Sequence, residues 1–366
     1  MNVIYMYIVI WSKSLISICF YLTVCYSIIN KKIESGDKMI RFGIVGSNWI
    51  TERFIKAGKQ HQDFTVSAVY SRNENKAKEV AAKNQIENAF HNLEEMAQSS
   101  EIDAVYIATP NSLHCEQALL FMQNGKHVLC EKPFASNKSE AEKMIVAAKT
   151  NGVTLMEAMK STLMPNFIAV KENLHKIGKV QSYFSTNCRL SPFYEQYKKG
   201  ELPNLFNPRL AGGSLMDLGV YTVYPIVELF GVPESIIASG NVLSSGVDGN
   251  GQITLDYHGF KANVMFSCIS ESTLPTEIQG EDGTLLIHHI SSPKKAEILF
   301  SNGVIEDISE PEQFDPMYYE IKEFIELIQT NSLESPRNSW ENTIVTMDIL
   351  DEARKQMGVA VTKENE

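Results

Sequence analysis

Three residues of this chain have side chains and spacings that could move a proton. Lys132 follows a short apolar run, residues 127–130, and precedes Pro133. Asp217 and Tyr221 lie four residues apart, so they share one face if their segment is helical. A neighbouring carboxylate and phenol can take a proton from an alcohol, provided that a cation such as Lys132 stabilises the phenolate.

Each of these residues also has an ordinary structural explanation. Lys132 could be a solvated charge at the end of a strand. Tyr221 could be a half-buried residue of an aromatic helix, with Asp217 in the first turn, where a negative charge favours the helix dipole. The spacing alone leaves both explanations open, so the elements that carry these residues must be considered.

The first part of the chain alternates apolar strands with helical segments. Ile40–Val45 is the first predicted strand, and the alternation continues to a last strand at residues 154–157. This rhythm predicts an α/β fold with a parallel, doubly wound sheet. In such a sheet ligands bind where the strands end, which is where residues 127–130 place Lys132.

The turn after the first predicted strand fits a dinucleotide site in part. Such a site needs a backbone that approaches the pyrophosphate closely, with the N–H groups of a helix start directed at it. Gly46 matches the first glycine of the fingerprint, whereas Asn48 and Thr51 replace the other two. Because asparagine tolerates a left-handed backbone, Asn48 could keep the turn and add its amide to the phosphate site.

The end of the second predicted strand favours NADP. That strand, residues 65–70, is followed by Ser71 and Arg72 instead of the acid that binds an unmodified ribose. A hydroxyl and a guanidinium suit a 2′-phosphate, since arginine offers phosphate a bidentate fork. The alternative is that Arg72 is a surface residue at the start of the next helix, and NAD is also compatible with the fold.

The rest of the chain predicts a different architecture. Short strand candidates follow one another from residue 180 to residue 300, with predicted hairpin turns at Gly249-Asn250, Asp282-Gly283 and Asn302-Gly303. Short turns between strands predict an α+β domain with a large open, mainly antiparallel sheet. Ser214 is predicted to be the N-cap of the helix that carries Asp217 and Tyr221.

Composition limits the classes of partner. The 366 residues suffice for two domains, and the net charge of −11 disfavours nucleic acid or an anionic membrane as a general partner. The six cysteines include no CxxC pair, so we expect neither disulfide bonds nor a metal site. We interpret them as small buried residues of a cytoplasmic protein.

The amino terminus differs from the rest. Residues 3–10 and 15–29 are apolar and resemble a signal anchor or a marginal membrane span. A polar stretch then leads to Met39, directly before the first predicted strand. We therefore expect residues 1–38 to be an upstream extension, and a form starting at Met39 to have no membrane contact.

Together, these segments resemble the Gfo/Idh/MocA oxidoreductase family. The resemblance covers essentially all of residues 39–361 and rests on the order and spacing of residues 43–46, 108–114, 131–133, 157–158 and 212–221. It implies a Rossmann domain at residues 39–158 and a substrate and dimerisation domain at residues 159–335. It also implies a C-terminal helix, residues 336–366, that packs back on the Rossmann domain, and a homodimer or a dimer of dimers.

The resemblance also implies an activity. With tyrosine at position 221, the chain resembles the branch of the family that contains glucose–fructose oxidoreductase, NADP-dependent xylose dehydrogenase and dimeric dihydrodiol dehydrogenase. By that analogy Tyr221 is the general base, Lys132 lowers its pKa and holds the substrate hydroxyl, and Asp217 orients substrate or base. The implied reaction transfers a hydride between the nicotinamide of NADP and a carbinol carbon of a sugar, polyol or cyclic diol. The implied cofactor contacts are Gly46, Ser47, Asn48, Trp49, Ile50, Ser71, Arg72, Thr109, Pro110, Asn111, His114, Glu131 and Lys132.

Two other functions fit the same family resemblance. A dinucleotide-sensing regulator would have no need of Lys132 and Tyr221, and a redox-neutral NAD-dependent glycosidase would have little use for Arg72. Asn187, Arg189 and Lys160 are polar residues that could contact substrate hydroxyls, and the sequence does not rank them.

Overall fold

The computed structural model describes residues 39–359. The predicted upstream extension, Cys19 and Cys25 lie outside the described residues. The four cysteines within them are free thiols, and Cys115, Cys130 and Cys268 are buried, as expected.

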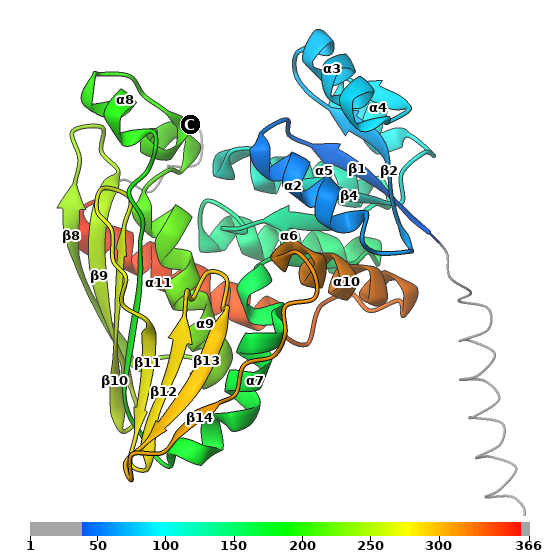
Figure 1. Cartoon of the computed structure of the whole chain (residues 1–366). Helices are drawn as coiled ribbons and strands as arrows, with labels where there is room; N and C mark the ends of the chain where they lie inside the picture. Colours follow the sequence, from blue (N-terminus) through cyan, green and yellow to red (C-terminus); the bar gives the residue numbers. More distant parts are fainter. Residues whose placement is uncertain (1–38, 360–366) are drawn as a thin grey trace, which may run out of the picture. The chain divides into compact units, whose positions relative to one another are not determined.

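The first half of the described chain forms a six-stranded parallel sheet with helices on its faces (Figure 1). Its strand order, β3-β2-β1-β4-β5-β6, is that of a doubly wound dinucleotide-binding sheet, which confirms the predicted fold class. The strands are β1 (Ile40–Val45), β2 (Phe64–Tyr70), β3 (Asn88–Phe90), β4 (Ala104–Ile107), β5 (His127–Glu131) and β6 (Leu155–Ala158). The helices between them are α2 (Trp49–Gly58), α3 (Glu74–Asn84), α4 (Leu93–Gln98), α5 (His114–Gln123) and α6 (Lys138–Asn151).

Strand register brings the ends of four strands to one edge of this sheet. Val45 pairs with Ile107, Ile107 pairs with Cys130, and Glu131 pairs with Ala158. The residues that follow β1, β4, β5 and β6 therefore lie side by side at the carboxyl edge. Lys132, which directly follows β5, is one of them.

The second half of the chain builds an eight-stranded sheet of order β14-β13-β12-β11-β7-β10-β9-β8. Only the β7–β10 pair is parallel, so the sheet is mixed and mainly antiparallel, as predicted. The short, largely exposed β14 was not predicted. The strands are β7 (Val180–Cys188), β8 (Ser235–Val242), β9 (Asp248–Tyr257), β10 (Phe260–Ser267), β11 (Thr276–Gly280), β12 (Gly283–His288), β13 (Lys295–Phe300) and β14 (Ile305–Asp307).

One of the three predicted hairpin turns is wrong. Gly249 and Asn250 lie inside β9, where Asn250 pairs with Asn241 of β8. The turn between β8 and β9 comes earlier, and the Leu243 N–H closes it by donating to the Val247 carbonyl at 2.8 Å. The other two predicted turns do connect neighbouring strands.

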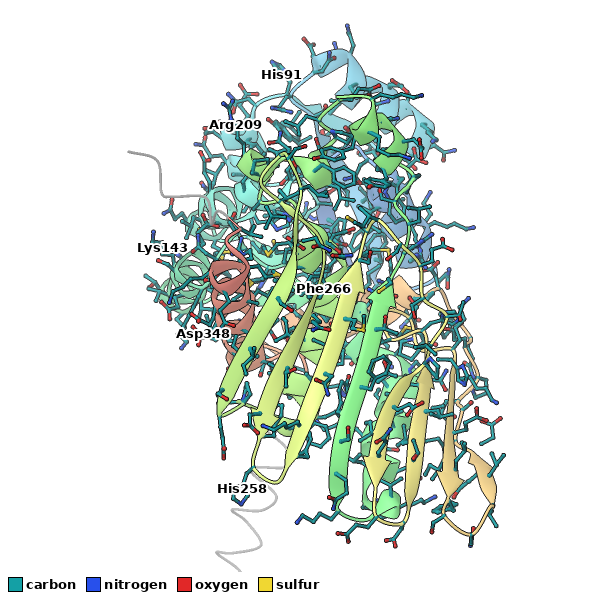
Figure 2. All side chains as sticks on the ribbon, turned by 90° about the vertical axis from the view of Figure 1, so that its left-hand side faces the viewer. His91, Lys143, Arg209, His258, Phe266 and Asp348 are labelled. Carbon is teal, nitrogen blue, oxygen red and sulfur yellow. The ribbon has the colours of Figure 1, made fainter. Side chains whose placement is uncertain are left out.

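The eight-stranded sheet has one covered face and one open face. Helices α7 (Pro165–Asn173), α9 (Val220–Phe230) and α11 (Trp340–Met357) cover the first face (Figure 1). Figure 2 shows the other face, over which no helix of residues 39–359 passes. Burial alternates along β10 accordingly, with Ala262 and Val264 buried while Lys261 and Met265 are exposed.

Two late helices return to the first sheet. In α10 (Pro316–Gln329), Met317 and Phe324 join the apolar core that contains Phe42 of β1. Helix α11 contacts α6, and the Lys138 N–H donates to the Asp351 carboxylate at 2.8 Å. The short helical segments are η1 (Asn111–Leu113), η2 (Lys160–Leu163), η3 (Leu174–Ile177), α8 (Tyr194–Lys198), η4 (Asn204–Phe206) and η5 (Pro208–Leu210).

The helix predicted to begin at Ser214 starts differently. Ser214 already has helical dihedral angles and makes no side-chain capping bond, so the N-cap prediction is wrong. The carboxylate of Asp248 instead accepts from the Leu215 N–H at 2.6 Å. A π-helical segment, η6 (Leu215–Gly219), then leads into α9. The stretch Pro208–Phe230 is apolar enough to cross a membrane, but 78% of its most apolar part is buried, which is typical of a core helix.

Candidate active site

The carboxyl edge of the first sheet borders a cavity of about 330 Å³. The other walls come from the start of α2, the end of β7, the η6–α9 helix, the segment before β13, and α10. The residues that line it are Asn48, Trp49, Ile50, Arg53, Ala108, Thr109, Glu131, Lys132, Ala158, Lys160, Asn187, Arg189, Asp217, Leu218, Tyr221, Ser291, Ser292, Met317 and Glu320.

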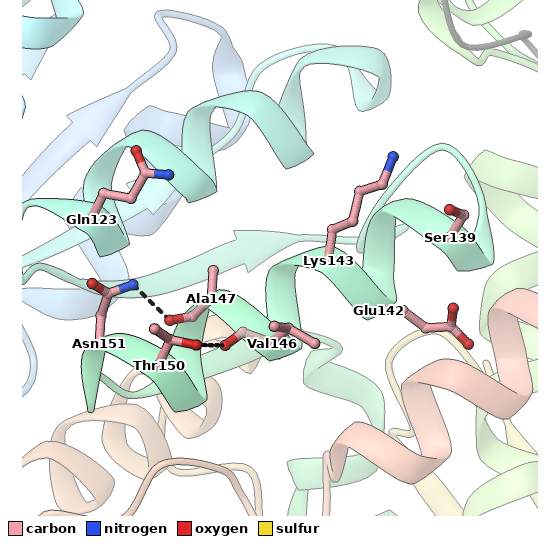
Figure 3. A pocket seen from close by; sticks show the side chains of 8 residues that line it. All are labelled: Gln123, Ser139, Glu142, Lys143, Val146, Ala147, Thr150 and Asn151. Atoms are coloured by element: carbon pink, nitrogen blue, oxygen red, sulfur yellow. Dashed lines mark hydrogen bonds between the residues drawn. The ribbon is translucent and has the colours of Figure 1, made fainter.

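A second hollow, of about 520 Å³, lies on the surface between α5 and α6 (Figure 3). The Thr150 hydroxyl and the Asn151 amide there donate to backbone carbonyls of their own helix, at 2.8 Å each. This groove lies away from the strand ends that carry the candidate residues. The cavity at the carboxyl edge is therefore the candidate active site.

The cavity brings together all three predicted catalytic residues and part of the predicted cofactor set. Asn48, Trp49, Ile50, Thr109, Glu131, Lys132, Asp217 and Tyr221 line it. The other predicted cofactor contacts do not: Gly46, Ser47, Ser71, Arg72, Pro110, Asn111 and His114.

The π-helical η6 positions Asp217. A π turn is a rare departure from α-helical geometry that is frequent at functional sites. Gly213, at φ +119°, precedes it in a conformation that favours glycine, and a Cβ there would lie 2.3 Å from an Asp248 carboxylate oxygen. Because Asp248 also holds the Leu215 N–H, this packing fixes the start of the helix that carries Asp217 and Tyr221.

Lys132 and Asp217 form a short ion pair. The Lys132 ammonium donates to the Asp217 backbone carbonyl and to its carboxylate, at 2.8 Å each. The same nitrogen lies 5.0 Å from the centroid of the Tyr221 ring, within cation–π range. Lys132, Asp217 and Tyr221 therefore form one contiguous group.

A second lysine contacts Tyr221 more directly. The Lys160 ammonium donates to the Tyr221 hydroxyl at 2.7 Å and lies 4.4 Å from the ring centroid. The sequence analysis named Lys160 only as a possible substrate contact. Its place two residues after the end of β6, at the ligand edge, is the signal that could have ranked it higher.

Burial controls the protonation of these groups. Burial raises the pKa of the Tyr221 phenol well above its usual range, and the nearby Glu131 and Glu320 raise it further. The same burial lowers the pKa of Lys160 to about 8. The two hydrogen-bonded groups are thus shifted in opposite directions, because burial penalises whichever form is charged.

Two acids line the cavity, Glu131 at the end of β5 and Glu320 of α10. Burial raises the pKa of Glu131, which accepts a hydrogen bond from the Tyr106 hydroxyl. Glu320 is 1% exposed, and neither of its carboxylate oxygens has a hydrogen-bond partner among residues 39–359. Burial and the Glu131 charge raise the pKa of Glu320 well above its usual range. Glu320 could not be predicted from the sequence, because it joins the cavity only through the packing of α10.

The turn after β1 has the close approach of a dinucleotide site. Gly46 has φ +129°, and a Cβ there would lie 2.7 Å from the Ala108 carbonyl oxygen. Asn48 is extended, at φ −96°, so the prediction of a left-handed asparagine is wrong. It is the N-cap of α2, accepting from the Ile50 and Thr51 N–H groups, and its amide donates to the Ala108 carbonyl at 3.0 Å. Its amide therefore orders the turn.

The end of β2 presents a cation. Arg72 is exposed and has no hydrogen bond or ion pair to the described residues, while Ser71 is half-buried beside it. Arg72 does not open the next helix, because Asn73 is the N-cap of α3 and accepts from the Lys76 N–H. A free guanidinium at this strand end fits the 2′-phosphate of NADP.

The segment after β4 supports the cavity more than it lines it. Thr109 borders the cavity, and its hydroxyl donates to Gln117 at 2.7 Å. Asn111 donates to the Ala211 carbonyl, and His114 is fully buried between the carbonyl oxygens of Pro133 and Thr109, at 3.0 and 2.9 Å. Burial lowers the pKa of His114. His114 thus ties this segment to the turn that carries Lys132.

Comparisons with known proteins agree with this geometry. Residues 40–159 match the family described as the oxidoreductase family with an NAD-binding Rossmann fold, and residues 173–286 match the GFO/IDH/MocA C-terminal domain. The chain is 53% identical to scyllo-inositol 2-dehydrogenase (NADP(+)) of Bacillus subtilis over 88% of this chain and 98% of the relative. It is 33% identical to trans-1,2-dihydrobenzene-1,2-diol dehydrogenase of Danio rerio, over 89% and 99%.

Solved structures show the same fold. A 3-ketoreductase from Actinomadura kijaniata, in complex with NADP and TDP-benzene, matches with a TM-score of 0.76 at 24% identity. The match covers 87% of this chain and 98% of the reductase.

Proposed function

The chain belongs to the Gfo/Idh/MocA oxidoreductase family, and from this premise we propose that it oxidises a carbinol of a cyclic polyol with Tyr221 as general base. It is an NADP-dependent oxidoreductase that acts on CH–OH groups, as its named relatives are. The observation that carries the proposal is the convergence of Lys132, Asp217 and Tyr221 on one cavity at the carboxyl edge of the Rossmann sheet.

The proposal gives each of these residues a task that the geometry supports. An ammonium has three N–H donors, and Asp217 takes two of those of Lys132, so the third can hold the substrate hydroxyl. Asp217 therefore orients Lys132. Tyr221 accepts the hydroxyl proton while the carbinol C–H bond breaks and its electron pair leaves as hydride. NADP, when bound, supplies the hydride acceptor.

The residues of the Rossmann edge fit that cofactor. Gly46 and the start of α2 would receive the pyrophosphate, since a helix N-terminus attracts anions. Ser71 and Arg72 would bind the 2′-phosphate. Thr109, Glu131 and Lys132, which border the cavity, would surround the nicotinamide and its ribose.

The far wall of the cavity supports a substrate rich in hydroxyl groups. Asn187 and Arg189 from the end of β7, together with Ser291 and Ser292, offer hydrogen-bonding groups on the side away from the Rossmann sheet. Such a wall suits a polyol better than an apolar ring, because amide, guanidinium and hydroxyl groups can exchange hydrogen bonds with substrate hydroxyls. The name of the Bacillus subtilis relative supports an inositol as the substrate, within the predicted class of sugars, polyols and cyclic diols.

We also propose a cytoplasmic homodimer. Free thiols at all four described cysteines suit a reducing compartment. The open face of the eight-stranded sheet offers a broad surface for a second copy of the chain.

Cofactor reduction by the full chain tests the function. We would follow absorbance with NADP and NAD in parallel, using scyllo-inositol, myo-inositol, xylose, glucose and trans-cyclohexane-1,2-diol. Turnover of a cyclic polyol, faster with NADP, is expected. Tight NADP binding without turnover of any of these alcohols would contradict the proposal and favour a sensor.

A further inference from the structure

Lys160 is a charged residue of the cavity to which the proposed mechanism gives no task. It begins η2, two residues after the end of β6, and its ammonium donates to the Tyr221 hydroxyl at 2.7 Å. Lys132 instead donates both of its side-chain hydrogen bonds within the described residues to Asp217, and it approaches the ring of Tyr221 and not its oxygen. Among residues 39–359, the group that holds the Tyr221 oxygen is therefore Lys160.

Tyr221 alone would be a poor base at neutral pH. Burial raises its phenol pKa well above the usual range, so the hydroxyl keeps its proton. Burial acts in the opposite direction on Lys160, whose pKa falls to about 8. Because the two groups share a hydrogen bond, the proton that leaves near pH 8 belongs to the pair and not to either residue.

Resting on the function above, we propose that Tyr221 and Lys160 act as one proton-accepting couple. When the carbinol is oxidised, the Tyr221 oxygen takes the proton of the substrate hydroxyl, and the Lys160 nitrogen receives the proton that Tyr221 releases. The neutral amine becomes an ammonium, the tyrosine stays neutral, and the carbinol becomes a carbonyl as its hydride leaves to NADP. In the reductive direction the same transfers run backwards, and the ammonium proton returns through Tyr221 to the product oxygen.

The charges around the couple allow this exchange. Glu131 and Glu320 favour the ammonium form of Lys160, whereas Lys132 and Arg53 favour the neutral amine. Because the pKa of Glu320 is raised, its neutral form is favoured, and this form stabilises the Lys160 ammonium less than a carboxylate would. The groups that face the couple are thus Glu131 at the end of β5, Lys132 directly after it, Asp217 of η6, Arg53 of α2 and Glu320 of α10.

The pH profile of kcat/KM, measured with the best alcohol and saturating NADP, tests the couple. Oxidation needs the deprotonated couple, so the wild-type value should rise with pH through about 8. The reverse reduction should fall over the same range. In Lys160→Met the ionisation should disappear from the profile, with a loss of about 100-fold or more at the plateau, typical of a missing proton acceptor.

Lys160→Arg separates a proton acceptor from a fixed cation. Arginine can donate to the Tyr221 oxygen but does not lose its own proton in a protein. We therefore expect Lys160→Arg to lose activity as Lys160→Met does. A wild-type profile in Lys160→Arg, or an unchanged ionisation in Lys160→Met, would overturn the couple.

Lys149→Met is the matched control. Lys149 also lies over an aromatic ring, 5.1 Å from the centroid of Trp340, but on the exposed side of α6. Its variant should keep the wild-type profile. NADP affinity, measured by fluorescence titration, should stay near wild type in all three variants and thereby report a folded Rossmann domain.

A titration without substrate separates this inference from the proposed function. In protein labelled with ¹³C at lysine Cε, the Lys160 resonance is the one missing from Lys160→Met. It should titrate near pH 8 in the wild type and move in Tyr221→Phe. An ordinary lysine titration, or no response to Tyr221→Phe, would overturn the couple even in an active enzyme. If no alcohol turns over while this resonance behaves as expected, the proposed function fails and the couple stands.

Discussion

Lys132 shows how one residue can serve both architecture and chemistry. Its ammonium is held by Asp217, and its side chain is only 13% exposed although it carries a charge. A buried charge needs such a partner, because its desolvation is otherwise costly. The pairing also leaves the third Lys132 N–H for the substrate hydroxyl. Replacement of the charge should therefore affect turnover more than the binding of cofactor.

Lys132→Met should abolish turnover while leaving NADP binding within a few-fold of wild type. The reason is that methionine keeps the volume of the lysine stem but cannot hold the substrate hydroxyl. We expect kcat to fall by about 1,000-fold, the scale of a lost electrostatic contact in a transition state. Steady-state kinetics and a fluorescence titration measure the two quantities, and appreciable residual turnover would remove Lys132 from the mechanism.

Arg72→Ala should weaken NADP far more than NAD. The exposed guanidinium has no described partner to lose, so its removal acts through the 2′-phosphate alone. A charge-assisted bond of about 1.5–3 kcal/mol corresponds to a loss of roughly 10–150-fold in NADP affinity. Isothermal titration with both cofactors measures this. Equal losses for NADP and NAD would count against the 2′-phosphate role.

The candidate residues could be found from the sequence when each followed a recognisable strand or lay on a helix face. Lys132 follows β5, and Asp217 and Tyr221 share the η6–α9 helix. The contact between Lys160 and Tyr221 joins residues 61 positions apart, and no local pattern reports it. Glu320 was missed for the same reason.

At the scale of elements, the end of β6 is held by a buried acid. Glu157 accepts from the Phe134 N–H at 3.1 Å and from the Thr343 hydroxyl at 2.9 Å, and so links β6 to the turn after β5 and to α11. It is 2% exposed, and burial raises its pKa to about 7. The stability that Glu157 contributes at this strand end therefore depends on pH.

The sign of that dependence follows from the raised pKa. Between the unfolded value of 4.5 and the folded value of about 7, the folded state binds more protons, so Glu157 makes stability fall as pH rises. Glu157→Gln lacks this ionisation. The free energy of unfolding of the wild type relative to Glu157→Gln should therefore fall by roughly 3 kcal/mol between about pH 4.5 and about pH 8. Urea unfolding at both pH values measures it, and a constant difference would show that Glu157 is not buried as an acid.

Local signals located most elements but not their ends. The four Rossmann strands predicted above, β1, β2, β5 and β6, lie within one residue of the predicted apolar runs, because buried parallel strands are mostly apolar. Ser214 is of a residue type that is common at N-caps, yet Asp248, 33 positions after Leu215, accepts the Leu215 N–H at the start of that helix. Gly249-Asn250 has the composition of a hairpin turn but lies within β9. Tertiary partners overrode the local preference in both cases.

At the scale of the whole molecule, the open sheet face is the surface left uncovered. Met265 lies on this face in β10, 41% exposed, and Ile237 of β8 is 70% exposed. If this face joins two copies of the chain, Met265→Glu should convert a dimer to a monomer in sedimentation velocity. Val146→Glu, at an exposed position on α6, is the control and should stay dimeric. A wild-type monomer would contradict the proposed assembly.

The two sheets could be predicted because strands alternate with helices in the first part of the chain and follow one another after residue 180. The cavity could not be predicted in this way. Its walls come from segments between residues 48 and 320, and their meeting depends on how α10 returns to α2. The family resemblance supplied the expectation that Lys132 and Tyr221 meet. The structure adds the partners of each.

The most direct test of the central claim is NADP reduction by the wild type and by Tyr221→Phe, with the best alcohol of the panel. Phenylalanine keeps the ring that the Lys132 and Lys160 ammonium groups contact and removes only the hydroxyl oxygen. We predict that the wild type reduces NADP and that Tyr221→Phe binds NADP normally but turns over about 100- to 10,000-fold more slowly. A Tyr221→Phe variant with wild-type turnover would contradict the assignment of Tyr221 as the general base.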